Sequence, residues 1–434
     1  CCKCKTSLSL TSLALGPRAA KGNQGLRMIF RAPFPVPTTI CAVLIMVMGL
    51  LARSPCSAFS FTHRSSKRIG QHVWEYQSPL TAVNCRSQQQ GLMMMSSSTD
   101  RKKVIFLGTP DVAAQTLNRL LKASEEGRGG GFDISAVVTQ PPAPAGRKKK
   151  LTPSPVQVLA EEKGLIVLTP EKAKDDNFIE TLTQIGPDLC ITAAYGQFLP
   201  TKFLNIPKFG TLNIHPSLLP RWRGASPVQR ALEAGDEVTG VSVLFTVLKM
   251  DAGPIAKSIE YICTGDEQAP WLLEHLFGLG TDGLVEVLPA VWDGTIKTTE
   301  QDEATAVAAD KISKADGLLD FGAMGAAECH NRGRGFAGWP GVQSTFLIGE
   351  SDEPTSIKIL TTKLVAKECG SSEPTQEVKL KGNLLEVICG DGSVLGVTEL
   401  QPPNKKGMAV KAWWNGLRGE RVRWCRPSAP PLSS

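Results

Sequence analysis

The sequence predicts an α/β chain in which a doubly wound, mostly parallel sheet is followed by a small β-barrel of OB-like type. Between residues 103 and 293, short apolar runs alternate with segments of helical periodicity, which is typical of strand–helix–strand units. Beyond residue 319, short strand-like runs are separated by Gly-rich turns, which favours a small barrel. The composition, 42% hydrophobic and 21% charged, is that of a soluble globular protein.

The first domain is expected to begin with a buried strand at residues 104–108 and a helix at residues 111–121, with Asp111 as its N-cap. A second helix is expected after Pro155, and a covering helix at residues 271–288. Further strands are expected at residues 134–139, 165–168, 189–194, 211–214 and 239–248.

The second domain is predicted from strand-like runs at residues 342–348, 357–365, 377–380, 384–388 and 394–400. Residues 294–309 are polar and aperiodic and predict a linker. We expect the barrel domain at residues 319–426, a linker at residues 294–318 and a disordered Pro/Ser-rich tail at residues 427–434. Trp413, Trp414 and Trp424 lie among seven Lys/Arg residues near the C-terminus, and we expect them in the barrel core.

The first hundred residues resemble a targeting presequence. Residues 40–52 are apolar but too short to cross a bilayer, and basic residues precede them while small ones follow, as in a signal peptide. A start at Met28 would give this signal a conventional length. Residues 59–98 contain one acidic residue, Glu75, and are rich in Ser, Gln and Arg, as in a transit peptide. We expect a bipartite plastid presequence, with a mitochondrial presequence as the alternative, and no membrane attachment of the mature protein.

The net charge of +7 comes from this presequence, because residues 1–100 hold 11 Lys/Arg and 2 Asp/Glu. The rest of the chain is slightly acidic, so binding of a polyanion must depend on local clusters. Of the 12 cysteines, those after residue 100 include no CxxC pair, and Cys190 and Cys389 among them lie singly in apolar runs. We therefore expect core cysteines and neither a disulfide framework nor a metal site.

Three polar residues are the candidates for chemistry. Asn213 and His215 stand at the end of one strand and, by alternation, point to the same side, where both could donate hydrogen bonds to one oxyanion. Asp251 follows the next long strand, which can bring its carboxylate beside His215. Taken singly, a strand-end His is more often a core or capping residue, and an Asp before Ala-Gly is usually a turn residue.

The loop after His215 changes that interpretation. The run Asn213-Ile214-His215-Pro216-Ser217-Leu218-Leu219-Pro220-Arg221-Trp222-Arg223-Gly224-Ala225-Ser226-Pro227 resembles the signature of the folate-dependent formyltransferases. Phe106-Leu107-Gly108-Thr109-Pro110-Asp111 and Ala194-Tyr195-Gly196 are similar to the branch that acts on methionyl-tRNA. The resemblance extends over residues 103–422. It implies a Rossmann-like formyltransferase domain, here residues 101–293, joined to a barrel domain that holds tRNA.

The resemblance also implies site residues and partners. Asn213, His215 and Asp251 would be catalytic, and Ser217, Leu218, Leu219 and Pro220 would line the tetrahydrofolate site. The donor would be 10-formyltetrahydrofolate, the acceptor initiator methionyl-tRNA, and no metal would be needed. We expect a monomer.

A basic run, Arg147, Lys148, Lys149 and Lys150, lies in a Pro-flanked loop after the second strand. Such a run is usually a solvated face, but the family inserts a basic loop here that enters the acceptor end of tRNA. Glycinamide-ribonucleotide and nucleotide-sugar formyltransferases, and an RNA-binding module without catalysis, are the alternatives. Gly108-Thr109-Pro110 is not GxGxxG, which disfavours a dinucleotide site.

Overall fold

The computed structural model describes residues 62–65, 72–75, 101–146, 149–365 and 375–427. The predicted signal segment lies outside these residues, as does most of the predicted transit segment. Within the latter, Thr62–Ser65 (β1) and His72–Glu75 (β2) form an antiparallel pair. A two-stranded ladder is at best marginally stable in water by itself, so this pair does not make a folded domain.

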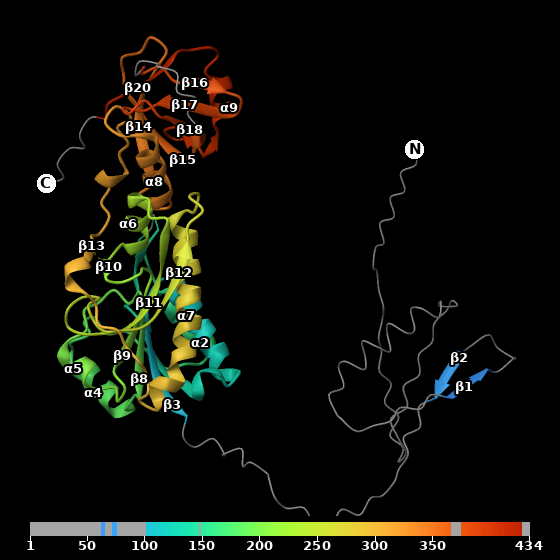
Figure 1. Ribbon diagram of the computed structural model, residues 1–434, viewed down its shortest axis with the longest axis vertical. Coiled ribbons are helices and arrows are strands. Elements are labelled where there is room, and N and C mark those ends of the chain that lie inside the picture. Colours follow the sequence, from blue (N-terminus) through green and yellow to red (C-terminus); the bar gives the residue numbers. More distant parts are fainter. Residues whose placement is uncertain (1–61, 66–71, 76–100, 147–148, 366–374, 428–434) are drawn as a thin grey trace, which may run out of the picture. The chain divides into compact units, whose positions relative to one another are not determined.

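A seven-stranded sheet forms the centre of the first domain (Figure 1). Its order is β12-β11-β9-β8-β3-β4-β7, and all neighbours are parallel except those of β11. The chain moves outward from β3 to β4 and β7 and then resumes with β8 on the other side of β3, which confirms the predicted doubly wound topology. The strands are Lys102–Gly108 (β3), Phe132–Val138 (β4), Val167–Leu168 (β7), Leu189–Ala193 (β8), Thr211–His215 (β9), Val238–Phe245 (β11) and Ile255–Ile262 (β12).

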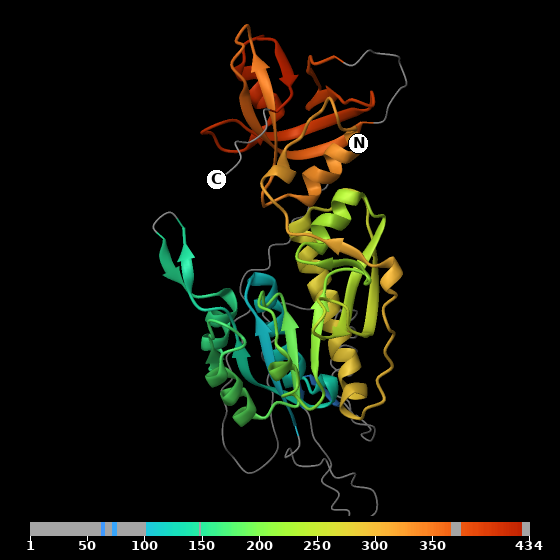
Figure 2. The same cartoon turned by 90° about the vertical axis from the view of Figure 1, so that its left-hand side faces the viewer.

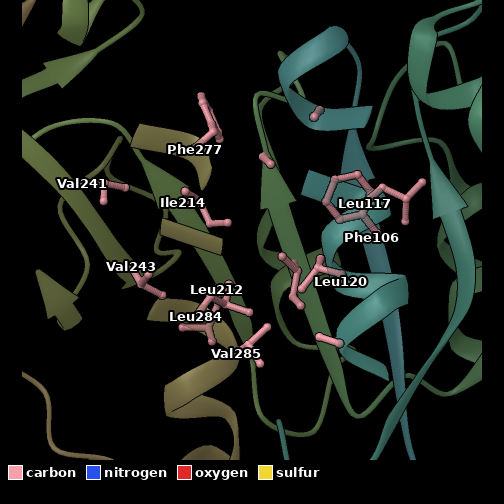
Figure 3. Packing of buried hydrophobic residues seen from close by; sticks show 14 of the residues in the cluster. Phe106, Leu117, Leu120, Leu212, Ile214, Val241, Val243, Phe277, Leu284 and Val285 are labelled. Atoms are coloured by element: carbon pink, nitrogen blue, oxygen red, sulfur yellow. The ribbon is translucent and has the colours of Figure 1, made fainter. Parts of the chain in front are cut away.

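Helices cover both faces of this sheet. Val104 and Phe106 of β3 belong to one core with residues of α2 and α7, whereas Ile105 and Leu107 belong to a second core with residues of α4 and α5. Figure 3 shows Phe106 beside Leu117 and Leu120 of α2 in the first core. Burial on both faces explains why β3 is an unbroken apolar run. The helices are Asp111–Glu125 (α2), Arg128–Gly130 (η1), Pro155–Glu162 (α3), Asp176–Ile185 (α4), Thr201–Leu204 (α5), Pro227–Ala234 (α6) and Ala269–Trp292 (α7).

The predicted N-cap of α2 is wrong by one residue. Pro110 occupies the cap, with its carbonyl accepting hydrogen bonds from the amides of Ala113 and Ala114, and no side chain caps the helix. Asp111 is instead the first helical residue, where its negative charge favours the positive end of the helix dipole.

The segment predicted as an aperiodic linker is ordered. It contains Glu303–Thr305 (η2), Val307–Ala309 (β13) and Ala315–Gly317 (η3). β13 pairs in parallel with Arg221–Gly224 (β10), so the segment folds back onto the loop of residues 216–224, here called the signature loop. Gly224 is required at this contact because a Cβ there would lie 2.6 Å from the carbonyl oxygen of Ala309.

The second domain is a nearly closed antiparallel barrel, as predicted. Its strand order is β16-β17-β18-β15-β14-β20, and a bridge between Glu377, just before β16, and Arg423 of β20 brings the two ends together. Trp413 and Trp424 are buried in its core, as expected, and Trp414 packs against it. The elements are Ala326–Gly335 (α8), Val342–Ile348 (β14), Thr355–Val365 (β15), Lys379–Lys381 (β16), Leu384–Ile388 (β17), Val394–Gln401 (β18), Met408–Ala409 (β19), Val410–Gly416 (α9) and Val422–Cys425 (β20).

Candidate active site

Asn213 and His215 lie at the carboxyl end of β9, on the side of the strand away from its neighbours Leu212 and Ile214. Leu212 and Ile214 are buried in the core formed with α2 and α7. Because side chains alternate along a strand, Asn213 and His215 share the opposite side. The two residues therefore face one space, as the sequence predicts.

The amide of Asn213 is oriented by a threonine on the neighbouring strand. Thr192 of β8 is its register partner, and the Thr192 hydroxyl donates a hydrogen bond of 2.7 Å to Asn213 Oδ1. This contact occupies the acceptor end of the amide and leaves its NH2 group as a donor. Thr192 is the one polar residue in the apolar run of β8, which is only a weak signal for its role.

Both ring nitrogens of His215 face protein groups. Nε2 lies 2.9 Å from the carbonyl oxygen of Trp222, and because a carbonyl only accepts, Nε2 carries the hydrogen. Nδ1 lies 3.6 Å from Asp251 Oδ2, which is too long for a good hydrogen bond but within ion-pair range of a protonated ring. The side chains of His215 and Asp251 are only 6% and 15% exposed, so their interaction is weakly screened by water.

Asp251 reaches this position from the turn between β11 and β12, as predicted from the neighbouring strands. Its backbone is left-handed, with φ of +49°, which is uncommon for a residue other than glycine. Its Oδ2 accepts a hydrogen bond of 3.0 Å from the amide of Gly224. Among the residues that the structure describes, Oδ1 has no hydrogen-bond donor, so this oxygen can accept a proton from a substrate.

The ordered linker stabilises the Asp251 turn. The side-chain amide of Gln301 donates to the carbonyl oxygens of Asp251 (2.8 Å) and Gly253 (2.7 Å). Its oxygen accepts from Arg223 Nε at 2.9 Å, and Arg223 also pairs with Glu303. Sequence reasoning missed Gln301, because only the folded path of the linker brings it to the turn.

The residues predicted to line the folate site hold the signature loop together. The Ser217 hydroxyl is fully buried and donates to the carbonyl of Arg221 (2.8 Å), while the amide of Leu219 donates to Ser242 Oγ (3.1 Å). Leu219 is also buried, whereas Leu218 and Pro220 are half-buried. Of these four residues, only Leu218 and Pro220 offer side-chain surface to a ligand.

A second anchor of the loop is Asp236. Its carboxylate accepts two hydrogen bonds from the Arg221 guanidinium, 2.9 and 2.7 Å, and one of 2.7 Å from Trp222 Nε1. The hydrogen bond to Asp236 raises the pKa of Arg221 above its usual value. Asp236 thus fixes Trp222, whose carbonyl contacts His215.

A cleft of about 510 Å³ lies beyond the carboxyl ends of β4, β7 and β8. Doubly wound sheets bind ligands at this edge. Gln140 and Gly196 line the cleft, and the Gln140 amide donates to the carbonyl of Tyr195 (3.0 Å). None of the predicted folate residues lines it; its other lining residues are Glu171, Lys172, Ala173, Lys174, Gln197, Phe198 and Pro200.

The basic run lies at the turn of a hairpin. Ala143–Ala145 (β5) pairs with Lys150–Thr152 (β6), and the hairpin projects from the domain, drawn in blue-green in Figure 2. Lys149 and Lys150 are exposed, whereas Arg147 and Lys148 lie outside the described residues. Exposed ammonium groups on a projecting hairpin are suited to contact phosphates.

In the described ranges, no three His, Cys, Asp or Glu side chains gather in a way that could hold a metal ion. Cys190 and Cys389 are buried in the core, as expected, and burial raises the pKa of the Cys190 thiol. Within the same ranges, no helix is both long and apolar enough to span a membrane.

Comparison with known proteins identifies both domains. The sequence profile of the family described as "Formyl transferase" matches residues 102–288, and that of "Formyl transferase, C-terminal domain" matches residues 311–418. A protein of Methylococcus capsulatus is 38% identical over 322 residues, which are 74% of this chain and 99% of the relative. One of Macrococcus caseolyticus is 35% identical over 320 residues, 74% of this chain and 97% of the relative. Both are called methionyl-tRNA formyltransferase.

Solved structures show a more distant likeness. A sugar 3N-formyl transferase, WlaRD, crystallised in the presence of dTDP and 5-N-formyl-THF, is 16% identical with a TM-score of 0.49, covering 71% of this chain and all of that one. HypX from Aquifex aeolicus in complex with tetrahydrofolic acid is 14% identical with a TM-score of 0.47, covering 74% of this chain and 48% of that one.

Proposed function

Because this chain belongs to the methionyl-tRNA formyltransferase family of formyl-transferring enzymes, we propose that it formylates initiator methionyl-tRNA with 10-formyltetrahydrofolate as donor. The observation that carries this proposal is the convergence of Asn213, His215 and Asp251. These three groups provide an amide donor, an imidazole and a carboxylate in one largely buried space, which acyl transfer to an amine requires.

In the proposed reaction, the neutral amine of the methionyl group attacks the formyl carbon and the carbonyl oxygen becomes an oxyanion. Asn213 donates its NH2 group to that oxygen, held in orientation by Thr192. His215 donates a second hydrogen bond after exchanging its contact with the Trp222 carbonyl. Such preorganised donors stabilise the developing charge without reorganisation of solvent.

In the proposed reaction, Asp251 transfers the proton that the attacking amine loses. Its Oδ1 accepts the proton that the attacking amine loses, and its Oδ2 faces His215 and stabilises the imidazolium form. The proton then passes to N10 of the folate as the bond between N10 and the formyl carbon breaks. The products are N-formylmethionyl-tRNA and tetrahydrofolate, so the atoms balance without a further reactant. No step requires a metal ion.

Recognition of tRNA is assigned to the basic hairpin and the barrel domain. Lys149 and Lys150 are exposed at the hairpin, and Arg147 and Lys148 adjoin them in the sequence. A hairpin that contacts RNA phosphates gains affinity by releasing counterions. We propose that the enzyme acts as a monomer.

An acceptor panel tests the proposed reaction. Purified protein from residue 101 onward, with 10-formyltetrahydrofolate, is offered charged initiator tRNA, glycinamide ribonucleotide and an amino-sugar nucleotide. We expect transfer to methionyl-tRNA only. Transfer to either small acceptor and not to tRNA would reassign the substrate, and no transfer to any acceptor would support an RNA-binding module without catalysis.

We also propose the cell compartment in which the enzyme acts. Residues 28–58 have the pattern of a signal peptide and residues 59–98 that of a transit peptide, which supports import into a plastid, with the mitochondrion as the alternative. An organelle that starts translation with formylmethionine needs such an enzyme. The mature N-terminus would then fall near residues 93–101, just before β3 begins at Lys102.

A fluorescent reporter fused to residues 28–100 tests the proposed localisation. Plastid fluorescence supports the bipartite presequence, and the Phe59→Ala variant of the fusion should then stop before the stroma. Mitochondrial fluorescence would overturn the plastid proposal and leave the enzyme proposal intact. Diffuse cytosolic fluorescence would contradict both the plastid and the mitochondrial localisation.

A further inference from the structure

Trp339 is an exposed aromatic residue in the loop between α8 and β14 of the barrel domain. Its side chain belongs to no aromatic pair in the described structure, and the residue is 55% exposed. Trp271, which is similarly exposed, lies parallel to His275 with ring centroids 5.1 Å apart, so one of its faces is occupied. Trp339 is therefore an exposed tryptophan that stacks on no other aromatic ring in the described part of the chain.

A cleft of about 210 Å³ opens beside this ring. Three segments build it: the Trp339 loop, the β14–β15 pair, and the linker just before η3. Its principal lining residues are Lys314, Trp339, Pro340, Gly341, Gln343 and Lys358. The cleft is large enough for one planar ring system and too small for a folded segment of protein.

The polar groups around the cleft are donors. Gln343 and Lys358 are direct register partners on β14 and β15, which places them side by side. Lys314 and Lys358 are exposed, and neither forms an ion pair among the residues that the structure describes. No acidic residue lines the cleft. Two ammonium groups without ion-pair partners, beside an exposed indole, attract an anionic ligand with a flat ring.

We propose that this cleft binds one unpaired nucleotide of the tRNA. The base stacks on the Trp339 ring, the Gln343 amide bonds to the base edge, and Lys314 and Lys358 contact the flanking phosphates. The inference rests on the proposed function, because it takes tRNA as the ligand. A protein partner is disfavoured because lysines are depleted in protein interfaces, whereas an aromatic ring with lysines suits single-stranded nucleic acid.

Binding of initiator methionyl-tRNA to the full chain, measured by filter binding at fixed salt, tests the site. Trp339→Ala should weaken binding roughly tenfold, as expected for losing one stacked base, while Trp339→Phe keeps most of the affinity. Trp271→Ala is the matched control and should not change it. Lys314→Ala and Lys358→Ala should each lower the log–log salt slope by up to about one unit.

Formylation kinetics separate this inference from the proposed function. If the wild-type enzyme formylates tRNA and Trp339→Ala raises the apparent KM for tRNA at unchanged kcat, the cleft is a tRNA site. Wild-type activity with unchanged tRNA affinity in Trp339→Ala and in both lysine variants would overturn the cleft and leave the function standing. Equal losses in Trp339→Ala and Trp339→Phe, with a lowered melting temperature, would show a structural role and also overturn it.

Discussion

Replacing Gln301 with Met should slow formyl transfer although Gln301 contacts no substrate in the proposed reaction. The side chain supplies two hydrogen bonds, of 2.8 and 2.7 Å, to the turn that carries Asp251. At about 1 kcal/mol net for each bond, the two contribute about 2 kcal/mol. The left-handed backbone of Asp251 costs a similar amount, about 1–3 kcal/mol, so the turn loses the contacts that offset its strain.

If losing the two hydrogen bonds destabilises the transition state by the full amount of about 2 kcal/mol, kcat falls by roughly 30-fold. Methionine has a side chain of similar length, so the change in volume is small. It removes both hydrogen-bond donors. Steady-state formylation at saturating tRNA measures the effect, with Gln184→Met, an exposed residue of α4, as the matched control. Affinity for tRNA should not change. A folded Gln301→Met enzyme with kcat within twofold of wild type would refute the argument that the linker positions Asp251.

Two further predictions concern tRNA binding and stability. Replacing Arg147, Lys148, Lys149 and Lys150 with Ala should raise the apparent KM for tRNA and lower its log–log salt slope by up to about one unit per lost phosphate contact; a change confined to the KM for folate would place the hairpin at the donor site instead. Glu267 is a buried carboxylate: desolvation acts to raise its pKa, but hydrogen bonds from Thr264 and Gly265 outweigh it and lower the pKa from 4.5 to about 2. The lowered pKa of Glu267 stabilises the folded state by about 3 kcal/mol above pH 4.5, and this stabilisation is lost as the pH falls toward 2. Glu267→Gln should therefore lower the free energy of unfolding by about that amount at pH 7, and by clearly less near pH 3, in urea titrations; an equal difference at both pH values would contradict the assignment.

The sequence predicted the first domain well because its strands are buried on both faces. Such strands are short, continuous apolar runs that stand out between amphipathic helices, and β3, β8 and β9 lie within a few residues of their predicted bounds. Helix α8 was not predicted. It contains two glycines and several polar residues, and because its buried side chains include His330 and Arg334, it has no apolar stripe that a sequence pattern could reveal. Its stability comes from tertiary contacts, such as the hydrogen bond of 3.0 Å between His330 Nε2 and the carbonyl of Gly265.

The candidate site was predictable where its residues lie in one motif. Asn213 and His215 share a side of β9 by simple alternation, and Asp251 follows the neighbouring strand. The groups that orient them, Thr192 and Gln301, are 21 and 50 residues away from their partners in sequence. Neither has a local signature, because their roles arise only once the sheet has formed and the linker has folded back.

Single-turnover formylation of initiator methionyl-tRNA by wild type and by Asp251→Asn tests the central claim most directly. Asparagine keeps the shape of the side chain and can still accept the hydrogen bond from Gly224, so the loop should stay folded. Its neutral amide, however, neither takes up the amine proton nor stabilises the His215 imidazolium. We predict that the rate of formyl transfer falls by about 10² or more while the affinity for tRNA is retained. Transfer at close to the wild-type rate in a folded Asp251→Asn enzyme would contradict the claim that Asn213, His215 and Asp251 together carry out the reaction.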